Sequence, residues 1–181
     1  MRVIIAGVPG AGKTTVLKEA LKIKDMEVIN YGDVMFEMAR QQGIKDRDEI
    51  RKLPHEKQLE LQVKAAKKIA EKDNIIIDTH CTIKTPYGYL PGLPYDVLKI
   101  IKPKRIILVE ASPYEIEERR KKDAEIRERD VEEKEEIELH QMMNRIAAMC
   151  YATLTNATVK IIKNEEGKIG EAAREIVKAL E

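Results

Sequence analysis

The stretch Gly7-Val8-Pro9-Gly10-Ala11-Gly12-Lys13-Thr14 directly follows the apolar run Val3-Ile4-Ile5-Ala6. Its spacing, G-x-x-x-x-G-K-T, is typical of a phosphate-binding loop. Glycine tolerates positive φ and carries no Cβ, so such a loop can turn its backbone N–H groups inward around a phosphate. The alternative is a glycine-rich strand-to-helix turn with an incidental lysine, but the expected strand before the loop and helix after it favour the phosphate loop. We therefore expect the chain to bind a nucleotide.

The end of this loop supplies the cation and the hydroxyl that a nucleotide needs. Lys13 can reach the β and γ phosphate oxygens, and Thr14 opens the next helix, where its hydroxyl can ligate Mg²⁺. The helix N-terminus adds partial positive charge beside the phosphates. The candidate nucleotide-binding residues are Gly7, Val8, Pro9, Gly10, Ala11, Gly12, Lys13, Thr14 and Thr15.

Length, charge and cysteine content indicate one soluble domain. The 181 residues suffice for a full hydrophobic core, and 33 basic against 32 acidic residues leave a net charge of +1. That balance gives no overall field to hold nucleic acid or an anionic membrane. Cys81 and Cys150 have neither a disulfide nor a metal-ligand spacing, so no zinc site is expected. With no signal peptide and no 18-residue apolar run, we expect a cytoplasmic protein.

Apolar runs and helical periodicity alternate along most of the chain. They predict five parallel strands, each followed by helix, in a three-layer α/β fold with helices on both faces of the sheet. The expected strands are residues 2–6, 27–30, 74–77, 105–109 and 158–162. Ligands of such sheets bind beyond the carboxyl ends of the strands, where Gly7 and Asp78 both lie.

Some segments depart from this alternation. Between Gly43 and Asp73 only helices are expected, near 46–51 and from Pro54 onward. A turn is expected at 31–33 before a helix over 34–40, and a loop is expected around 88–94.

The second half of the chain is expected to contain two long helices. The first begins at a capping box formed by Ser112 and Glu115. The second, over about 132–154, carries apolar residues that face either the core or a second copy of the chain. These residues are Leu139, Met142, Ile146, Met149 and Leu154.

Asp78 follows three isoleucines on the strand expected beside the phosphate loop. A carboxylate there is placed to hold Mg²⁺, directly or through water. The alternative is an aspartate that caps the next turn.

Residues 115–136 form a charge run, in which 18 of 22 positions are charged. A solvated helix face is one explanation. The segment holds 11 acidic and 7 basic residues, so its arginines resemble individual phosphate clamps more than a nucleic-acid footprint. A segment that carries several such arginines can close over a triphosphate and stabilise the charge that develops during transfer.

Together these segments resemble the archaeal type of adenylate kinase over essentially the whole chain. The resemblance rests on residues 7–15, Asp78-Thr79-His80, the segment 83–94 and the segment 140–145. It implies a nucleoside-monophosphate-kinase-like fold in a single domain over 1–181, with a monophosphate-binding subdomain at about 31–72. It also implies a short lid at about 120–133, Mg²⁺-dependent transfer between ATP and AMP, and a homotrimer. The lid is too short for a zinc-binding insert.

The chemistry of such a transfer agrees with the residues. A phosphate acceptor is already ionised at neutral pH and needs no general base, so the site must mainly hold two polyanions in line. We expect Arg40 and Lys84 at the acceptor phosphate; Arg40 has the alternative of a helix-surface arginine. The other expected roles are Lys13, Arg120, Arg127 and Arg129 as catalytic cations, Thr14 and Asp78 at Mg²⁺, and Tyr31, Thr79 and His80 at the substrate.

Three aromatic or imidazole groups keep a structural alternative. His80 is also explained as a hydrogen-bonded structural histidine. Tyr87 and Tyr89 either stack on adenine or pack under the loop around 88–94.

Other functions compete with this one. A GTPase would need an Asn-Lys-x-Asp or Thr-Lys-x-Asp sequence, and neither occurs. A kinase for a hydroxyl metabolite would need a base, whereas the Arg and Lys set favours a phosphate acceptor. The remaining alternatives are an adenylate-kinase-like ATPase that assists ribosome assembly and a nucleoside monophosphate kinase for another base.

Overall fold

The computed structural model describes residues 1–124 and 133–181. In chain order the elements are β1 (Arg2–Ala6), α1 (Lys13–Ile23), β2 (Glu27–Asn30), α2 (Tyr31–Arg40), α3 (Arg47–Lys52), α4 (His55–Ala70), β3 (Ile75–Asp78), β4 (Thr82–Thr85), β5 (Gly88–Pro91), α5 (Tyr95–Ile101), β6 (Arg105–Glu110), α6 (Pro113–Ala124), α7 (Lys134–Thr155), β7 (Thr158–Lys163) and α8 (Ile169–Ala179).

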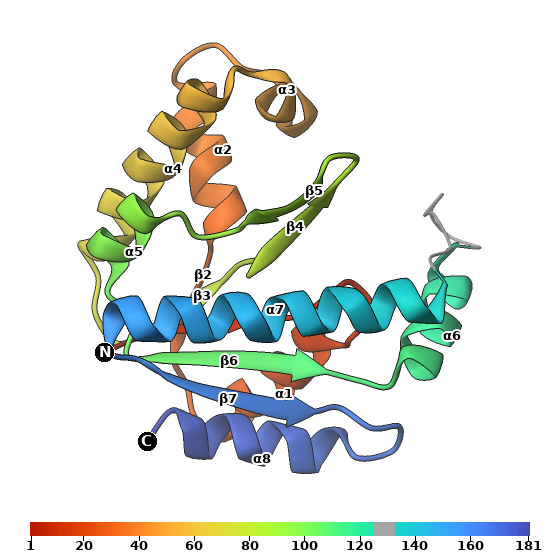
Figure 1. Cartoon of the computed structure of the whole chain (residues 1–181). Coiled ribbons are helices and arrows are strands. Elements are labelled where there is room, and N and C mark those ends of the chain that lie inside the picture. Colours follow the sequence, from red (N-terminus) through yellow and green to blue (C-terminus); the bar gives the residue numbers. More distant parts are fainter. Residues whose placement is uncertain (125–132) are drawn as a thin grey trace.

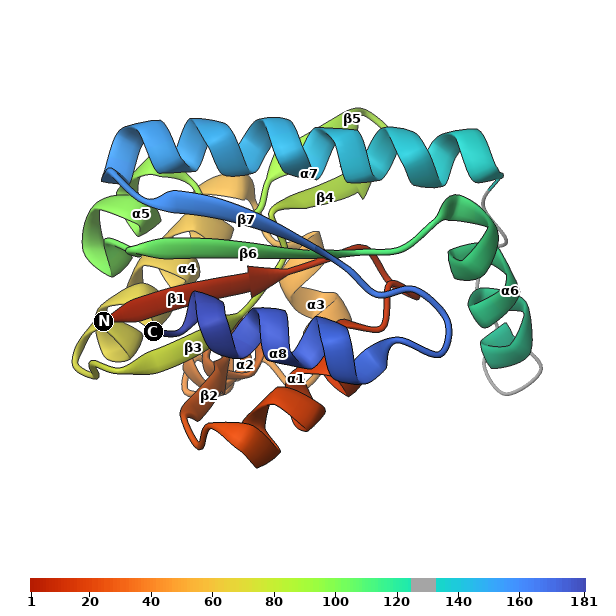
Figure 2. The same ribbon diagram turned by 90° about the horizontal axis from the view of Figure 1, so that it is seen from below.

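Within the described residues, five strands form a parallel sheet in the order β2-β3-β1-β6-β7, which confirms the expected fold class. Successive residues of β1 point to opposite faces, as the period of a strand requires. Ile4 packs in a core with residues of α4, α5 and α7, and Ile5 packs in another with residues of α1 and α8. Figures 1 and 2 show the helices on both sides of the sheet. The central position of β1 places the loop that follows it in the middle of the carboxyl edge.

The helices between β2 and β3 form a lobe that stands away from the sheet (Figure 1). Helix α2 packs on α4, and the lobe has its own small core of Ala39, Ile50 and Leu61. The expected turn at residues 31–33 is wrong, because α2 already begins at Tyr31. The Asn30 side chain accepts a hydrogen bond from the Asp33 N–H at 3.1 Å, and this cap starts the helix directly at the end of β2.

The loop expected around 88–94 is partly wrong as well. Strands β4 and β5 pair antiparallel as a hairpin, with Thr85 opposite Gly88 and Ile83 opposite Leu90. Gly88 has a φ of +116°, and the Thr85 hydroxyl donates to its carbonyl at 2.8 Å, so a two-residue connection closes the hairpin. Behind the hairpin, a Cβ on Gly92 would lie 1.9 Å from the His80 carbonyl oxygen, so the chain can cross there only with glycine.

The capping box at the start of α6 is confirmed. The Ser112 hydroxyl accepts from the Glu115 N–H at 3.2 Å, and the Glu115 carboxylate accepts from the Ser112 N–H at 3.1 Å.

Helix α7 buries a partly polar face and exposes an apolar row. Its buried side includes Gln141, Asn144 and Tyr151, whose polar atoms are hydrogen bonded. The residues that the sequence placed on its apolar face are exposed by 46–57%: Leu139, Met142, Ile146, Met149 and Leu154. Of the two orientations that the sequence left open, the structure shows this row turned away from the core. No helix in the described ranges 1–124 and 133–181 is long and apolar enough to span a membrane.

Candidate active site

The phosphate loop connects β1 to α1 at the centre of the sheet edge. Gly10 and Gly12 have φ values of +88° and +83°, which other residues rarely adopt. Inside the loop the Ala11 N–H donates to the Val8 carbonyl at 3.1 Å. At its start, a Cβ on Gly7 would lie 2.6 Å from the Val109 carbonyl of β6. The glycines therefore have distinct tasks: two allow the turn of the loop and one allows close contact with the neighbouring strand.

Lys13 and Asp78 meet at this edge. Strands β1 and β3 are neighbours, and their register pairs Ile5 with Asp78, the last residue of β3. The Lys13 ammonium forms a hydrogen-bonded ion pair with Asp78 Oδ1, and both side chains are about five-sixths buried. Asp78 therefore faces the phosphate loop. Thr14 is exposed in the first turn of α1, directly after the phosphate loop.

These residues fit a magnesium site of the kind that shares an ion with a nucleotide. Mg²⁺ keeps several water ligands and is commonly bound by one or two protein oxygens together with substrate phosphates. Asp78 and Thr14 offer one carboxylate and one hydroxyl at the phosphate loop. In the described part of the chain, no group of three or more His, Cys, Asp or Glu residues forms an all-protein metal cage.

Arg120 lies on the phosphate loop and is almost completely buried. Its Nε donates to the Pro9 carbonyl at 2.8 Å, and its side chain packs against Gly10. The expectation placed this arginine in a lid that reaches the phosphates on closure, whereas the structure has it already docked on the loop backbone. Arg127 and Arg129 lie outside the described residues.

The other candidate substrate residues divide between the core and the surface. Tyr31 is 4% exposed and its hydroxyl donates to the Gln62 carbonyl at 2.6 Å, so burial raises its pKa and the group is used within the lobe. This placement does not support the expected role of Tyr31 as a substrate ligand. Thr79 is also buried, and its N–H donates to the Ile5 carbonyl at 3.1 Å, while the His80 side chain is exposed.

Arg40 and Lys84 come from different elements. Arg40 is exposed in the last turn of α2 and lines a cavity of about 460 Å³ together with Phe36, Gly43, Ile44 and Lys45. Lys84 lies on β4, where its ammonium is 3.3 Å from the Glu136 carboxylate of α7. The two cations expected at the acceptor phosphate thus belong to the helical lobe and to the hairpin, whereas Lys13 and Asp78 lie at the edge of the sheet, at the start of α1 and the end of β3.

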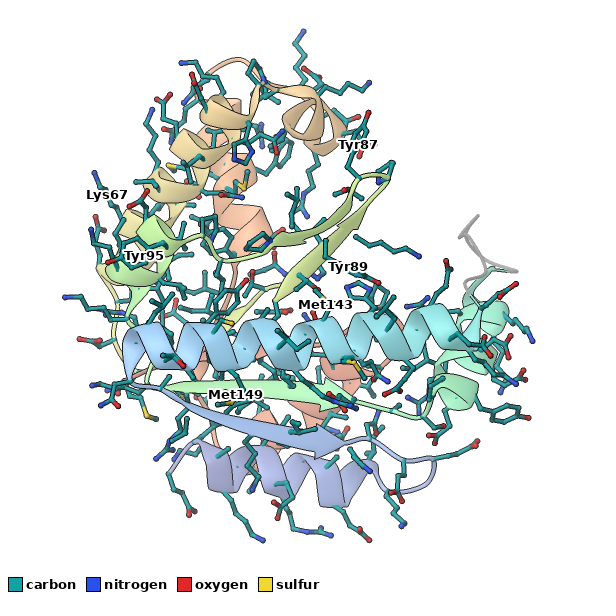
Figure 3. The ribbon with its side chains drawn as sticks, viewed as in Figure 1. Lys67, Tyr87, Tyr89, Tyr95, Met143 and Met149 are labelled. Atoms are coloured by element: carbon teal, nitrogen blue, oxygen red, sulfur yellow. The ribbon has the colours of Figure 1, made fainter. Side chains whose placement is uncertain are left out.

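The two tyrosines of the hairpin have different surroundings (Figure 3). Tyr87 lies at the tip and is completely exposed. Tyr89 points toward α7, where its ring centroid is 5.2 Å from that of His140. Packing under the hairpin therefore accounts for Tyr89, and Tyr87 makes no such contact with the core.

Sequence reasoning missed an ion pair with a buried carboxylate beside the loop. Glu110, the last residue of β6, is 5% exposed and accepts two hydrogen bonds from Arg145 of α7, at 2.8 and 2.7 Å. The carboxylate raises the pKa of Arg145 above its usual value. A signal was present, because Glu110 ends an apolar strand just as Asp78 does.

Asn164, which follows β7, was also missed. Its side chain is 4% exposed, and its Nδ2 donates to the Ala11 carbonyl of the phosphate loop at 2.9 Å. No motif marks this residue in the sequence, because the contact spans 153 positions.

Comparisons with known proteins agree with this geometry. Residues 6–138 match the family model of the AAA domain. The chain is 56% identical to the adenylate kinase of Methanopyrus kandleri over 98% of this chain and 96% of that protein. It is 53% identical to the adenylate kinase of Methanothermobacter thermautotrophicus over 99% of this chain and 98% of that protein.

Solved structures with a similar fold include shikimate kinase from Bacteroides thetaiotaomicron. The TM-score is 0.58 at 17% sequence identity, with 99% of this chain and 98% of that chain covered. This likeness supports the fold of a small phosphate-loop kinase, and the choice of acceptor rests on the site and the closer relatives.

Proposed function

The chain belongs to the archaeal adenylate kinases, and from that premise we propose that it transfers a phosphoryl group reversibly from ATP to AMP, which yields two ADP and balances the adenine nucleotides. The observation that carries the proposal is the phosphate loop with Lys13 beside Asp78 at the centre of the sheet. We propose Mg²⁺ bound with ATP as the cofactor, with no zinc. The whole chain, residues 1–181, acts as one kinase domain.

The donor nucleotide is held by the loop. Backbone N–H groups of the loop surround its phosphates, and Lys13 leaves Asp78 to contact the β and γ oxygens. Thr14 and Asp78 hold Mg²⁺, directly or through water. When bound, the metal would supply positive charge that offsets the negative charge developing during transfer. Because Lys13 and Asp78 neutralise each other until then, the site is not left with an unpaired buried charge.

The acceptor needs orientation rather than activation. The phosphate of AMP is ionised at neutral pH, so no side chain has to remove a proton from it. Arg40 and Lys84 bind that phosphate through their cationic groups, with Thr79 and His80 bordering it at the end of β3. Lys84 exchanges Glu136 for the phosphate, which costs little because that pair is solvent-exposed.

Two segments close the site over the substrates. The subdomain at about 31–72 corresponds to the lobe of α2, α3 and α4, and it carries Arg40 toward the sheet edge. The lid at about 120–133 brings Arg127 and Arg129 to the phosphates, with Arg120 already on the loop at one end. The catalytic cations therefore act together only when both nucleotides are bound.

The exposed row on α7 supports a homo-oligomer, and the family resemblance makes it a trimer. Leu139, Met142, Ile146 and Met149 recur at intervals of three and four residues, as in the seam of a coiled coil. A second copy would cover this row. Light scattering at micromolar protein should give a mass near three times 20.7 kDa, and a monomer mass would contradict the proposal.

The cell compartment is proposed as the cytoplasm. In the described part of the chain Cys81 is a buried free thiol and Cys150 an exposed one, which fits a reducing environment. The partners are then ATP, ADP and AMP, with neither nucleic acid nor a membrane required.

A direct assay tests the function. ADP formation from MgATP is measured with AMP, CMP, UMP or GMP as acceptor, with Lys13→Met protein as the blank for contaminating kinases. AMP should be the best acceptor by at least about one order of magnitude in kcat/KM. A higher kcat/KM for another monophosphate would make that nucleotide the acceptor in place of AMP. No transfer to any of the four would reject the proposed phosphotransferase activity.

A further inference from the structure

Three successive carbonyls of the phosphate loop are held from outside by three side chains. Arg120 Nε donates to the Pro9 carbonyl at 2.8 Å. Arg119 Nη1 donates to the Gly10 and Ala11 carbonyls at 3.4 and 3.3 Å. Asn164 Nδ2 donates to the Ala11 carbonyl at 2.9 Å. The outer surface of the loop is thus bonded to α6 and to the segment that follows β7.

These outer bonds fix the direction of the inner N–H groups. In a trans peptide the carbonyl and the N–H of the next residue point in opposite directions, and no cis peptide bond occurs within the described residues. Holding the Ala11 carbonyl outward therefore turns the Gly12 N–H inward. The same relation connects the Pro9 carbonyl with the Gly10 N–H. Both N–H groups are donors of the kind that a phosphate requires.

Asn164 is held in place by contacts of its backbone as well as of its side chain. Its backbone N–H donates to the Glu110 carbonyl at 2.7 Å, which ties it to the end of β6. A Cβ on Gly12 would lie 2.2 Å from Asn164 Nδ2, so the amide packs directly against the Ala11–Gly12 peptide. Its carbonyl also accepts from Arg119 Nη2 at 3.1 Å. Asn164 therefore contacts the loop backbone and one of its arginine donors at once.

A further contact braces the segment after Asn164. The Glu166 N–H donates to Glu115 Oε1 at 2.6 Å, and Glu115 also lies 3.7 Å from Arg119. Hydrogen bonds from Ser112 and the backbone hold the pKa of the Glu115 carboxyl below its usual value, so it stays ionised as an acceptor. The segment, α6 and the phosphate loop thus form one connected unit.

We propose that Asn164 is a positioning residue for the phosphates of ATP, which acts by orienting the Ala11–Gly12 peptide and does not itself touch the nucleotide. The inference rests on the proposed function, because it assigns the donor nucleotide to the loop. It predicts different effects on the two substrates. Loosening the peptide weakens the binding of ATP, whose phosphates the loop surrounds, and leaves the binding of AMP unchanged, because AMP binds on the side of the lobe and the hairpin.

The test compares Asn164→Ala and Asn164→Asp with wild type. Asn164→Ala removes the amide donor, and Asn164→Asp keeps the shape but replaces the donor by an acceptor that repels the Ala11 carbonyl. The KM for ATP and the Kd of a non-hydrolysable ATP analogue should rise about tenfold in Asn164→Ala and further in Asn164→Asp. The KM for AMP should change less than about twofold in both. Glu166→Ala is the matched control, since its side chain is exposed and only its backbone N–H makes the contact.

Two results would overturn the inference. One is an unchanged Kd for the ATP analogue in both Asn164 variants. The other is an equal rise in both KM values with a lowered melting temperature, which is what a general structural role produces. If Asn164→Ala does not fold, Asn164→Asp alone decides by the same criterion. The proposed function fails differently, by absence of AMP-dependent transfer in wild type, and the analogue binding measurement still tests Asn164 in that case.

Discussion

The two halves of the site are built in different ways. On the donor side, the phosphate loop leaves the central strand and its carbonyls are bonded to buried side chains such as Asn164 and Arg120. On the acceptor side, Arg40 is exposed beside an open cavity, and Lys84 forms a half-exposed ion pair with Glu136. We therefore propose that the donor half is preorganised, whereas the acceptor half is completed by movement of the lobe. Substitutions on the donor side should therefore weaken ATP binding or lower the rate of chemistry, and those on the acceptor side should mainly weaken AMP binding.

The largest effect is expected at Lys13. Lys13→Met removes the cation on the migrating phosphoryl group and should lower kcat by at least about two orders of magnitude in a folded protein. Steady-state kinetics and circular dichroism measure both. A variant that retains a tenth of the wild-type activity would contradict the role of Lys13 on the migrating phosphoryl group.

Asp78 should show a smaller effect, on the metal. Asp78→Asn removes charge beside Mg²⁺ and should raise the Mg²⁺ concentration for half-maximal rate by about thirtyfold. It also ends the ion pair with Lys13, so a modest loss of thermal stability accompanies it. Titration of MgCl₂ at fixed ATP gives the first quantity and a melting curve the second. Unchanged Mg²⁺ dependence with a large fall in melting temperature would make Asp78 a structural residue.

Arg40 tests the acceptor half. Arg40→Ala removes one charged contact to the AMP phosphate and should raise the KM for AMP about tenfold, with the KM for ATP nearly constant. Lys67→Ala is the matched control, because Lys67 is an exposed cation on α4 of the same lobe (Figure 3). Equal behaviour of the two variants would leave Arg40 as a helix-surface arginine.

The smallest effect is expected at Tyr31. Tyr31→Phe deletes the hydroxyl that donates to the Gln62 carbonyl and should lower the free energy of unfolding by about 1 kcal/mol. Neither KM should change, because the ring stays in the core that also contains Ile4 of β1 and residues of α4. Urea denaturation and steady-state kinetics provide the two readouts. A several-fold rise in the KM for AMP would instead support the expected role of Tyr31 at the substrate.

The same contrast explains what the sequence predicted. The strands and the phosphate loop follow from local signals, such as the isoleucine run before Asp78 and the glycine spacing after β1, and all five strands are confirmed. The resemblance to archaeal adenylate kinases is confirmed by the relatives. These features need only neighbouring residues to be recognised.

Most of the features that the sequence missed or left open depend on distant contacts. The face of α7 toward the core carries Gln141 and Asn144, which are favourable there only because Ala111 and Thr82 bond to them. The hairpin of β4 and β5 was not predicted, because its Pro and Gly residues are typical of a loop. Arg120 belongs to a charge run that gives no sign of which arginine reaches Pro9. The roles of Arg127 and Arg129 stay predictions.

The central claim is that a preorganised donor half waits for an acceptor before transfer can occur. Phosphate release from MgATP alone and ADP formation with saturating AMP, measured on the same protein, test it most directly. In the proposed mechanism the lid arginines and the lobe close only around both nucleotides, so hydrolysis without AMP should be at least about two orders of magnitude slower than transfer. Hydrolysis without AMP as fast as transfer with it would contradict the account and favour an ATPase that serves another partner.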